Sequence, residues 1–74
     1  MTRKEHFQII CMQVRLVRLA SEEWKTSISQ VNKLFQENGV YEYIENLWGI
    51  FHIESDYAVF DDICDYLKNK GIEL

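Results

Sequence analysis

Carboxylates between residues 54 and 65 are the first feature of this sequence that could support chemistry. Asp61 and Asp65 are four residues apart, so a helix would place them on one face, with Glu54 and Asp56 nearby in the sequence. Such oxygens can hold a divalent cation. The span contains no glycine-bearing calcium loop, however, and acids at a helix start are commonly stabilised by the helix dipole. We therefore expect exposed carboxylates here and no metal site.

The other residue types that catalyse reactions are isolated. His6 and His52 each stand alone, and no glycine-rich phosphate loop is present. Cys11 and Cys64 are the only cysteines and form no C-x-x-C motif, so they are interpreted as buried thiols, with a disulfide as the open alternative. We expect no catalytic residue, no cofactor and no enzymatic activity.

A helical hairpin around Asn38 and Gly39 could be a DNA-binding helix-turn-helix, since glycine is common in the turn of that motif. Its second helix would carry Glu42 and Glu45 and no base. DNA binding depends on neutralising phosphates. A hairpin used for packing is therefore the favoured interpretation, and a nucleic-acid-binding regulator is the alternative.

Hydrophobic periodicity predicts an all-α fold, a compact bundle of about four helices around one core, as a single domain spanning residues 1–74. The helices are expected at about residues 3–19, 27–38, 40–51 and 58–69, with Trp24 in a connection and residues 52–57 in a loop. Thr2 followed by Glu5 predicts a capping box at the first helix. The expected core residues are Phe7, Ile10, Val14, Val31, Leu34, Phe35, Ile44, Leu47, Trp48, Ile63 and Leu67.

The first helix carries two apolar stripes on nearly opposite faces, whereas an ordinary surface helix carries one. One stripe consists of Phe7, Ile10, Cys11, Val14 and Val17, and the other of Ile9, Met12, Leu16, Leu19 and Ala20. Two stripes predict a helix sandwiched by the others, or one whose second face meets another chain. In the latter case Ile9, Met12, Leu16 and Leu19 would form a homodimer interface.

Charge is distributed unevenly along the chain. Residues 1–33 hold six bases and three acids, whereas residues 34–67 hold eight acids and no Lys or Arg. The acidic half is interpreted either as a solubilising surface or as a face that binds a basic partner protein. As partner-binding residues we predict Glu42, Glu45, Asp61 and Asp65, with Tyr41, Tyr43 and Tyr66 as anchors.

In the order and spacing of several motifs, the chain resembles a family of small bacterial proteins known as domain of unknown function 3791. The matching motifs are Phe7, Ile10-Cys11, Leu34-Phe35, Gly39-Val40, Tyr43-Ile44, His52, Tyr57, Asp61-Asp62-Ile63 and Tyr66-Leu67. The resemblance covers about residues 6–70 and implies a compact helical domain without an established activity. It also implies a place beside genes for ADP-ribosyltransferase-like proteins, and hence an antitoxin-like or accessory role.

The sequence therefore favours a helical module that binds another protein over a nucleic-acid-binding regulator, and places an enzyme last. No apolar run is long enough to span a bilayer, and the N-terminal stretch lacks the features of a signal peptide. We accordingly expect a cytoplasmic protein that binds no membrane.

Overall fold

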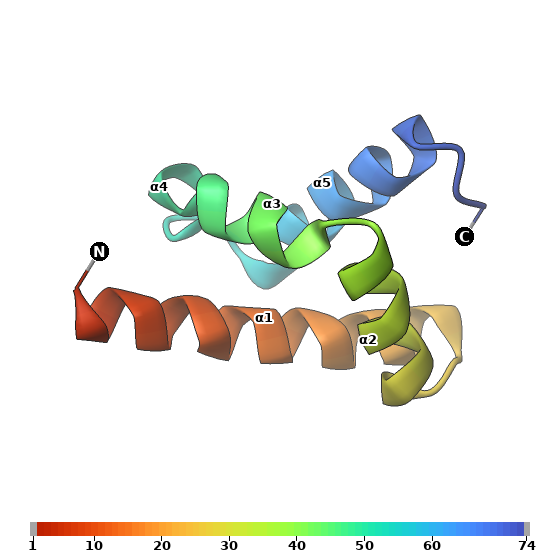
Figure 1. Cartoon of the computed structure of the whole chain (residues 1–74), viewed down its shortest axis with the longest axis horizontal. Coiled ribbons are helices and arrows are strands. Elements are labelled where there is room, and N and C mark those ends of the chain that lie inside the picture. The colour runs from red at the N-terminus through yellow and green to blue at the C-terminus, as the bar shows by residue number, and fades with distance from the viewer. Residues whose placement is uncertain (1, 74) are drawn as a thin grey trace.

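The structure is a computed structural model that describes residues 2–73, and these residues form a bundle of helices around one core (Figure 1). The helices are α1 (Arg3–Trp24), α2 (Ile28–Glu37), α3 (Val40–Asn46), α4 (Trp48–Phe51) and α5 (Asp56–Asn69). α1 runs along one side of the molecule, α3, α4 and α5 lie over it, and α2 connects the two layers at one end. The all-helical fold predicted from the periodicity is confirmed for the described residues.

α1 is longer than its pattern predicted. It begins as expected, with the backbone N–H of Glu5 donating to Thr2 Oγ1 at 3.1 Å. It was expected to end near Leu19 but continues to Trp24, after which Lys25 adopts a left-handed conformation at φ 51°. The extra turn carries the Trp24 ring into the core, with its centroid 6.3 Å from that of Phe35. Trp24 thus lies in a helix and contributes to packing, which corrects its expected place in a connection.

The predicted third helix is divided in two. The chain leaves helical geometry at Leu47, where φ is −101° and ψ is 12°, so α3 ends at Asn46 and α4 forms a single separate turn. Before this break, Gly39 has φ 69° and makes the left-handed turn that its position predicted. α5 begins two residues earlier than expected, because Ser55 caps it by accepting a hydrogen bond from the N–H of Ala58 at 3.2 Å.

The core lies between α1 and the layer above it. Its fully buried side chains include Leu16 of α1, Phe35 of α2, Ile44 of α3 and Ile63 of α5. Three residues predicted for the core, Phe7, Ile10 and Val14, are instead exposed, and three more, Leu34, Leu47 and Trp48, are only partly buried. The three exposed residues belong to one apolar stripe of α1, which the prediction turned towards the core. In the structure the opposite stripe, with Ile9, Met12 and Leu16, packs against the bundle.

Both cysteines are free thiols and both are half-buried. The expected burial of Cys11 and Cys64 is thus only partly met, and the two residues form no disulfide in this structure. Burial, and to a smaller extent the charge of Asp61, raises the pKa of the Cys64 thiol.

Candidate functional site

The most unusual surface feature is an apolar strip on the side of α1 that faces away from the core. Phe7 is 66% exposed, Ile10 42% and Val14 52%, and Ile28 at the start of α2 is 53% exposed. We call these four residues the α1 outer face. Ile10, Val14 and Ile28 border one groove, and Phe7 lies about one helical turn before Ile10 on the same side of α1. Clustered exposed apolar side chains commonly mark a binding site, whereas single ones are ordinary.

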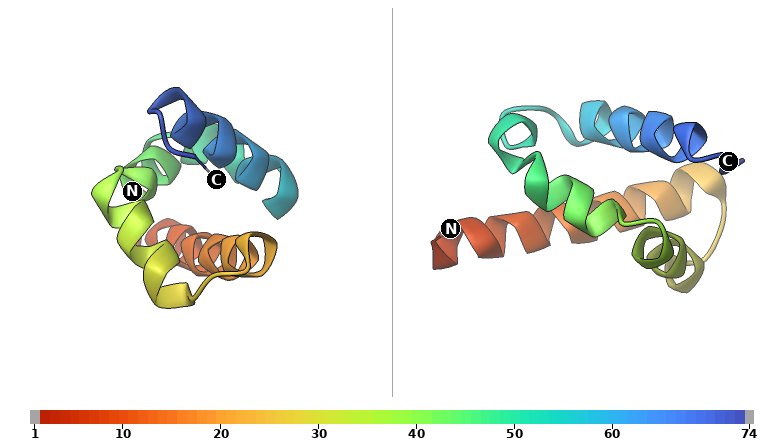
Figure 2. Two further views of the ribbon diagram at one scale, coloured as in Figure 1. Left: turned by 90° about the vertical axis from the view of Figure 1, so that its right-hand side faces the viewer. Right: turned by 45° about the horizontal axis from the view of Figure 1, so that its top comes forward.

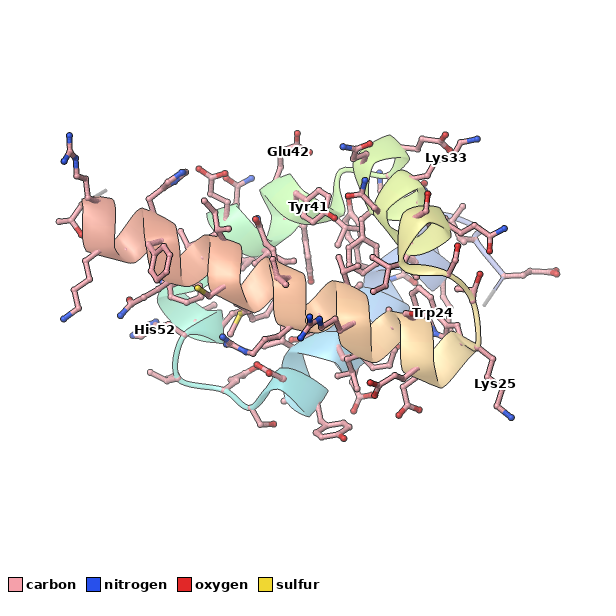
Figure 3. All side chains as sticks on the ribbon, turned by 90° about the horizontal axis from the view of Figure 1, so that it is seen from below. Trp24, Lys25, Lys33, Tyr41, Glu42 and His52 are labelled. Carbon is pink, nitrogen blue, oxygen red and sulfur yellow. The ribbon has the colours of Figure 1, made fainter. Side chains whose placement is uncertain are left out.

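A groove of about 640 Å³ runs along the outer face between α1 and α2. Ile10 and Val14 form one wall, Ile28 lies on the other side, and Val17 and Tyr41 also line it. Figure 3, in which α1 is seen from below the molecule, shows Tyr41 at the edge of α1 opposite to His52. The groove is thus an open channel with predominantly apolar walls.

Three of the polar residues that line this groove, Gln13, Asn32 and Tyr41, are hydrogen-bonded within the protein. Gln13 donates from Nε2 to the backbone oxygen of Tyr41 at 3.1 Å, and the Tyr41 hydroxyl donates to Asn32 Oδ1 at 2.6 Å. Burial raises the pKa of Tyr41 above its ordinary value of 10.0. A ligand in the groove would therefore find mainly apolar side chains to contact.

Two arginines lie near the outer face, and helical spacing also places Glu22 one turn after the second of them, Arg18. Arg18 lines the groove, and helical spacing places Arg3 on the same side of α1, one turn before Phe7. Within residues 2–73 the ion pairs are Arg15 with Asp56 and Lys33 with Glu37, so neither Arg3 nor Arg18 has an acidic partner there. None of the groove-lining residues is acidic.

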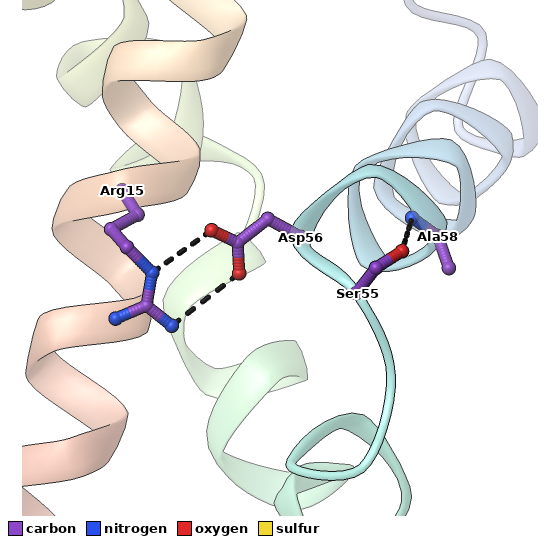
Figure 4. A network of polar contacts seen from close by, with 4 residues as sticks. All are labelled: Arg15, Ser55, Asp56 and Ala58. Atoms are coloured by element: carbon purple, nitrogen blue, oxygen red, sulfur yellow. Dashed lines mark hydrogen bonds and ion pairs between the residues drawn. The ribbon is translucent and has the colours of Figure 1, made fainter.

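A second, smaller groove of about 370 Å³ lies on the other side of α1. Phe7 and Arg15 line it from α1, and Trp48, His52 and Asp56 line it from the opposite layer. Its polar groups are engaged as well. The His52 Nδ1 atom lies 2.8 Å from the Trp48 backbone oxygen, and Arg15 forms an ion pair with Asp56 (Figure 4).

The stripe predicted to mediate self-association is not available for that role. Ile9, Met12 and Leu16 are buried in the monomer, and Leu19 is half-buried against the core. The sequence predicted both apolar stripes of α1, but α3 and α5 cover the stripe that was expected to bind a second chain. Self-association remains a prediction that could now involve only the other stripe.

The predicted acidic partner-binding face is exposed. Glu42 and Glu45 on α3, and Asp61 and Asp65 on α5, all lie at the surface. Asp56, which was considered as a metal ligand, is bound by Arg15 instead. Within residues 2–73, no group of three or more His, Cys, Asp or Glu side chains is arranged to hold a metal ion.

The three tyrosines predicted as anchors, however, belong to the fold. Tyr41, Tyr43 and Tyr66 are partly buried against the core. The rings of Tyr43 and Tyr66 stack with centroids 4.2 Å apart, and the Tyr66 hydroxyl donates to the Asn38 backbone oxygen at 2.7 Å. Removing Tyr43 or Tyr66 would disturb packing between α3 and α5, and removing Tyr41 would disturb its contacts with α2, so the three predicted anchors also contribute to the fold.

The described helices include none that is long and apolar enough to cross a membrane. Comparison with curated proteins gives no match, and comparison with solved structures gives none either. A sequence model of a family described as "Protein of unknown function (DUF3791)" matches residues 7–70, which is most of the chain. On that match, the chain belongs to the DUF3791 family of proteins of unknown function.

Proposed function

We propose that this protein is a small helical interaction module and that it binds another protein through the α1 outer face. The observation that carries the proposal is the exposure of Phe7, Ile10 and Val14 in a row beside an open groove. Leaving these side chains in water forgoes the free energy of their burial, which a bound partner would recover. The antitoxin-like or accessory role implied by the family resemblance makes a toxin-like protein encoded nearby the first partner to test.

The alternative function, a nucleic-acid-binding regulator, has less support. In the hairpin of α2 and α3, the second helix exposes Glu42 and Glu45, which would repel phosphates. The exposed bases of α1 are interspersed with apolar side chains, and interspersed bases and apolar residues suit a protein partner better than a duplex backbone.

Photo-crosslinking in the native host tests the proposed function. A photo-crosslinking amino acid at Val14 should yield a discrete crosslinked protein, whereas the same amino acid at Asn69, an exposed position near the end of α5, should not. Val14→Asp in a tagged chain should abolish co-purification of that protein while leaving the circular dichroism spectrum unchanged. A Val14 position that captures nothing, or a Val14→Asp variant that retains the partner, would contradict the proposal.

A further inference from the structure

This inference rests on the proposed function and adds the chemistry of the partner. We propose that the α1 outer face binds an acidic amphipathic helix of another protein. Its apolar side packs on Ile10, Val14 and Ile28, and its carboxylates lie beside Arg3 and Arg18.

The shape of the surface fits a helix. Arg3 and Arg18 lie at the two ends of the apolar strip on a continuous helix. At 1.5 Å of rise per residue they are about 22 Å apart along the helix axis, which corresponds to about four turns of a bound helix. The N-terminal turns of α1 extend past the layer above, which leaves this end of the strip open (Figure 2). Next to this strip, the groove lined by Ile10, Val14 and Ile28 offers apolar walls on which one side of an amphipathic helix can pack.

Charge determines which kind of helix fits. Arg3 and Arg18 have no acidic partner within residues 2–73, and no acid lines the groove. A carboxylate that reached either guanidinium would form a charge-assisted hydrogen bond, and a lysine in its place would meet a like charge. The chain as a whole carries a net charge of −4. Its long-range repulsion is screened beyond about 8 Å at physiological salt, so the local charges dominate at contact.

The same charges argue against a second copy of this chain as the occupant. If two α1 helices packed antiparallel through their outer faces, centred on Ile10, Arg3 of each copy would lie towards Arg18 of the other. Such a two-fold interface would contain four arginines and none of the acids of α3 and α5. An acidic helix would neutralise the positive charges of Arg3 and Arg18, whereas a second copy of the chain would double the positive charge at the interface.

Peptide selection tests the inference without requiring the natural partner. A displayed library of random peptides of about 18 residues, or roughly five helical turns, is selected on the immobilised full chain and depleted on Val14→Asn, which removes the apolar side chain without adding a charge. The enriched peptides should show apolar residues at intervals of three and four and a more negative net charge than the unselected library. Neutral or basic peptides, peptides without helical periodicity, or no enrichment over Val14→Asn would overturn the inference.

The arginine contact is tested with one enriched peptide on matched charge variants. Arg18→Gln should weaken binding by about two- to fivefold, the effect expected of one exposed ion pair. Lys68→Gln, which removes the same charge from exposed α5, should change it by less than about twofold. Equal effects of the two variants would refute the role of Arg18.

The results separate the inference from the proposed function. If Val14 crosslinks a host protein but the selected peptides are not acidic helices, the inference fails and the interaction module stands. If the crosslinking amino acid at position 14 captures only another copy of the chain, and sedimentation shows a dimer that Val14→Asp dissociates, the inference and the proposed function both fail.

Discussion

Arg15 of α1 and Asp56 at the start of α5 form a two-point ion pair that joins the two longest helices (Figure 4). Arg15 Nε lies 2.9 Å from Asp56 Oδ2, and Arg15 Nη2 lies 3.4 Å from Asp56 Oδ1. Ser55, the neighbour of Asp56, caps the same helix end, so two adjacent residues make a local bond within α5 and a contact with α1 at this end.

A double-mutant cycle should detect this pair. Arg15→Ala and Asp56→Ala should couple by about 0.2–1 kcal/mol in urea unfolding, because both side chains remain partly exposed to solvent. The coupling should shrink in concentrated salt. The Lys33–Glu37 pair, at 3.9 Å and more exposed, provides the control and should couple more weakly. Zero coupling between Arg15 and Asp56 at low salt would contradict the prediction that this contact stabilises the fold.

Truncation on the two sides of α1 should have unequal effects. Leu16→Ala should lower the free energy of unfolding by about 2–5 kcal/mol, since the side chain is fully buried. Val14→Ala should lower it by less than about 1 kcal/mol, since that side chain faces solvent. Urea denaturation measures both. Comparable losses would mean that the α1 outer face is packed against something in the isolated protein.

Replacing Gly39 should be costly, and replacing Gly49 should not. Gly39 has φ 69°, and an added Cβ would lie 3.3 Å from Glu42 Oε2 and 3.4 Å from the Tyr66 hydroxyl. Gly39→Ala should therefore cost about 1–2 kcal/mol from the left-handed conformation, with crowding in addition. Gly49 lies in α4 with nothing within 4 Å of such a Cβ, so Gly49→Ala should be neutral or stabilising by up to about 1 kcal/mol. Thermal unfolding measures both variants, and Gly39→Ala should have the lower melting temperature. A melting temperature of Gly39→Ala equal to or above that of Gly49→Ala would contradict the prediction.

Stability should decline at alkaline pH. Burial raises the pKa of Tyr43 above its ordinary value of 10.0, with smaller contributions from Asp62, Tyr66 and Asp65, and burial likewise raises the pKa of Cys64 above 9.0. Between the ordinary pKa of each group and its raised pKa in the folded chain, the unfolded chain has released a proton that the folded chain retains. This contribution to stability is complete below about pH 9 and is lost as pH rises through the folded-state pKa values.

The measurement for this prediction is the urea midpoint between neutral pH and pH about 11, compared with Tyr43→Phe and Cys64→Ala. Each substitution removes one titrating group, so each variant should lose less stability over the alkaline range than the parent chain. A midpoint that rises with pH, or variants that follow the parent curve, would contradict the assignment.

Several local features could be predicted from the sequence alone because neighbouring residues determine them. Thr2 and Ser27 cap α1 and α2 through their own side chains, and Gly39 makes a left-handed turn that most residues resist. Helical spacing correctly placed Val31 and Phe35 on the buried face of α2, whereas Leu34, which the same pattern assigned to the core, is only partly buried. Exposure of the acids on α3 and α5 followed from their charge.

Only the tertiary structure decided which face of α1 is buried and where the candidate site lies. Ile10 and Leu16 lie on stripes of similar hydrophobicity, so periodicity showed that both exist but could not choose between them. The choice depends on where α3 and α5 return along α1, where Ile44 and Ile63 are buried in one core with Leu16. These are contacts between residues far apart in the chain. The tyrosines of the acidic half show the same limit: their ring stacking and hydroxyl bonds depend on neighbours from other helices, so a sequence pattern could not place them.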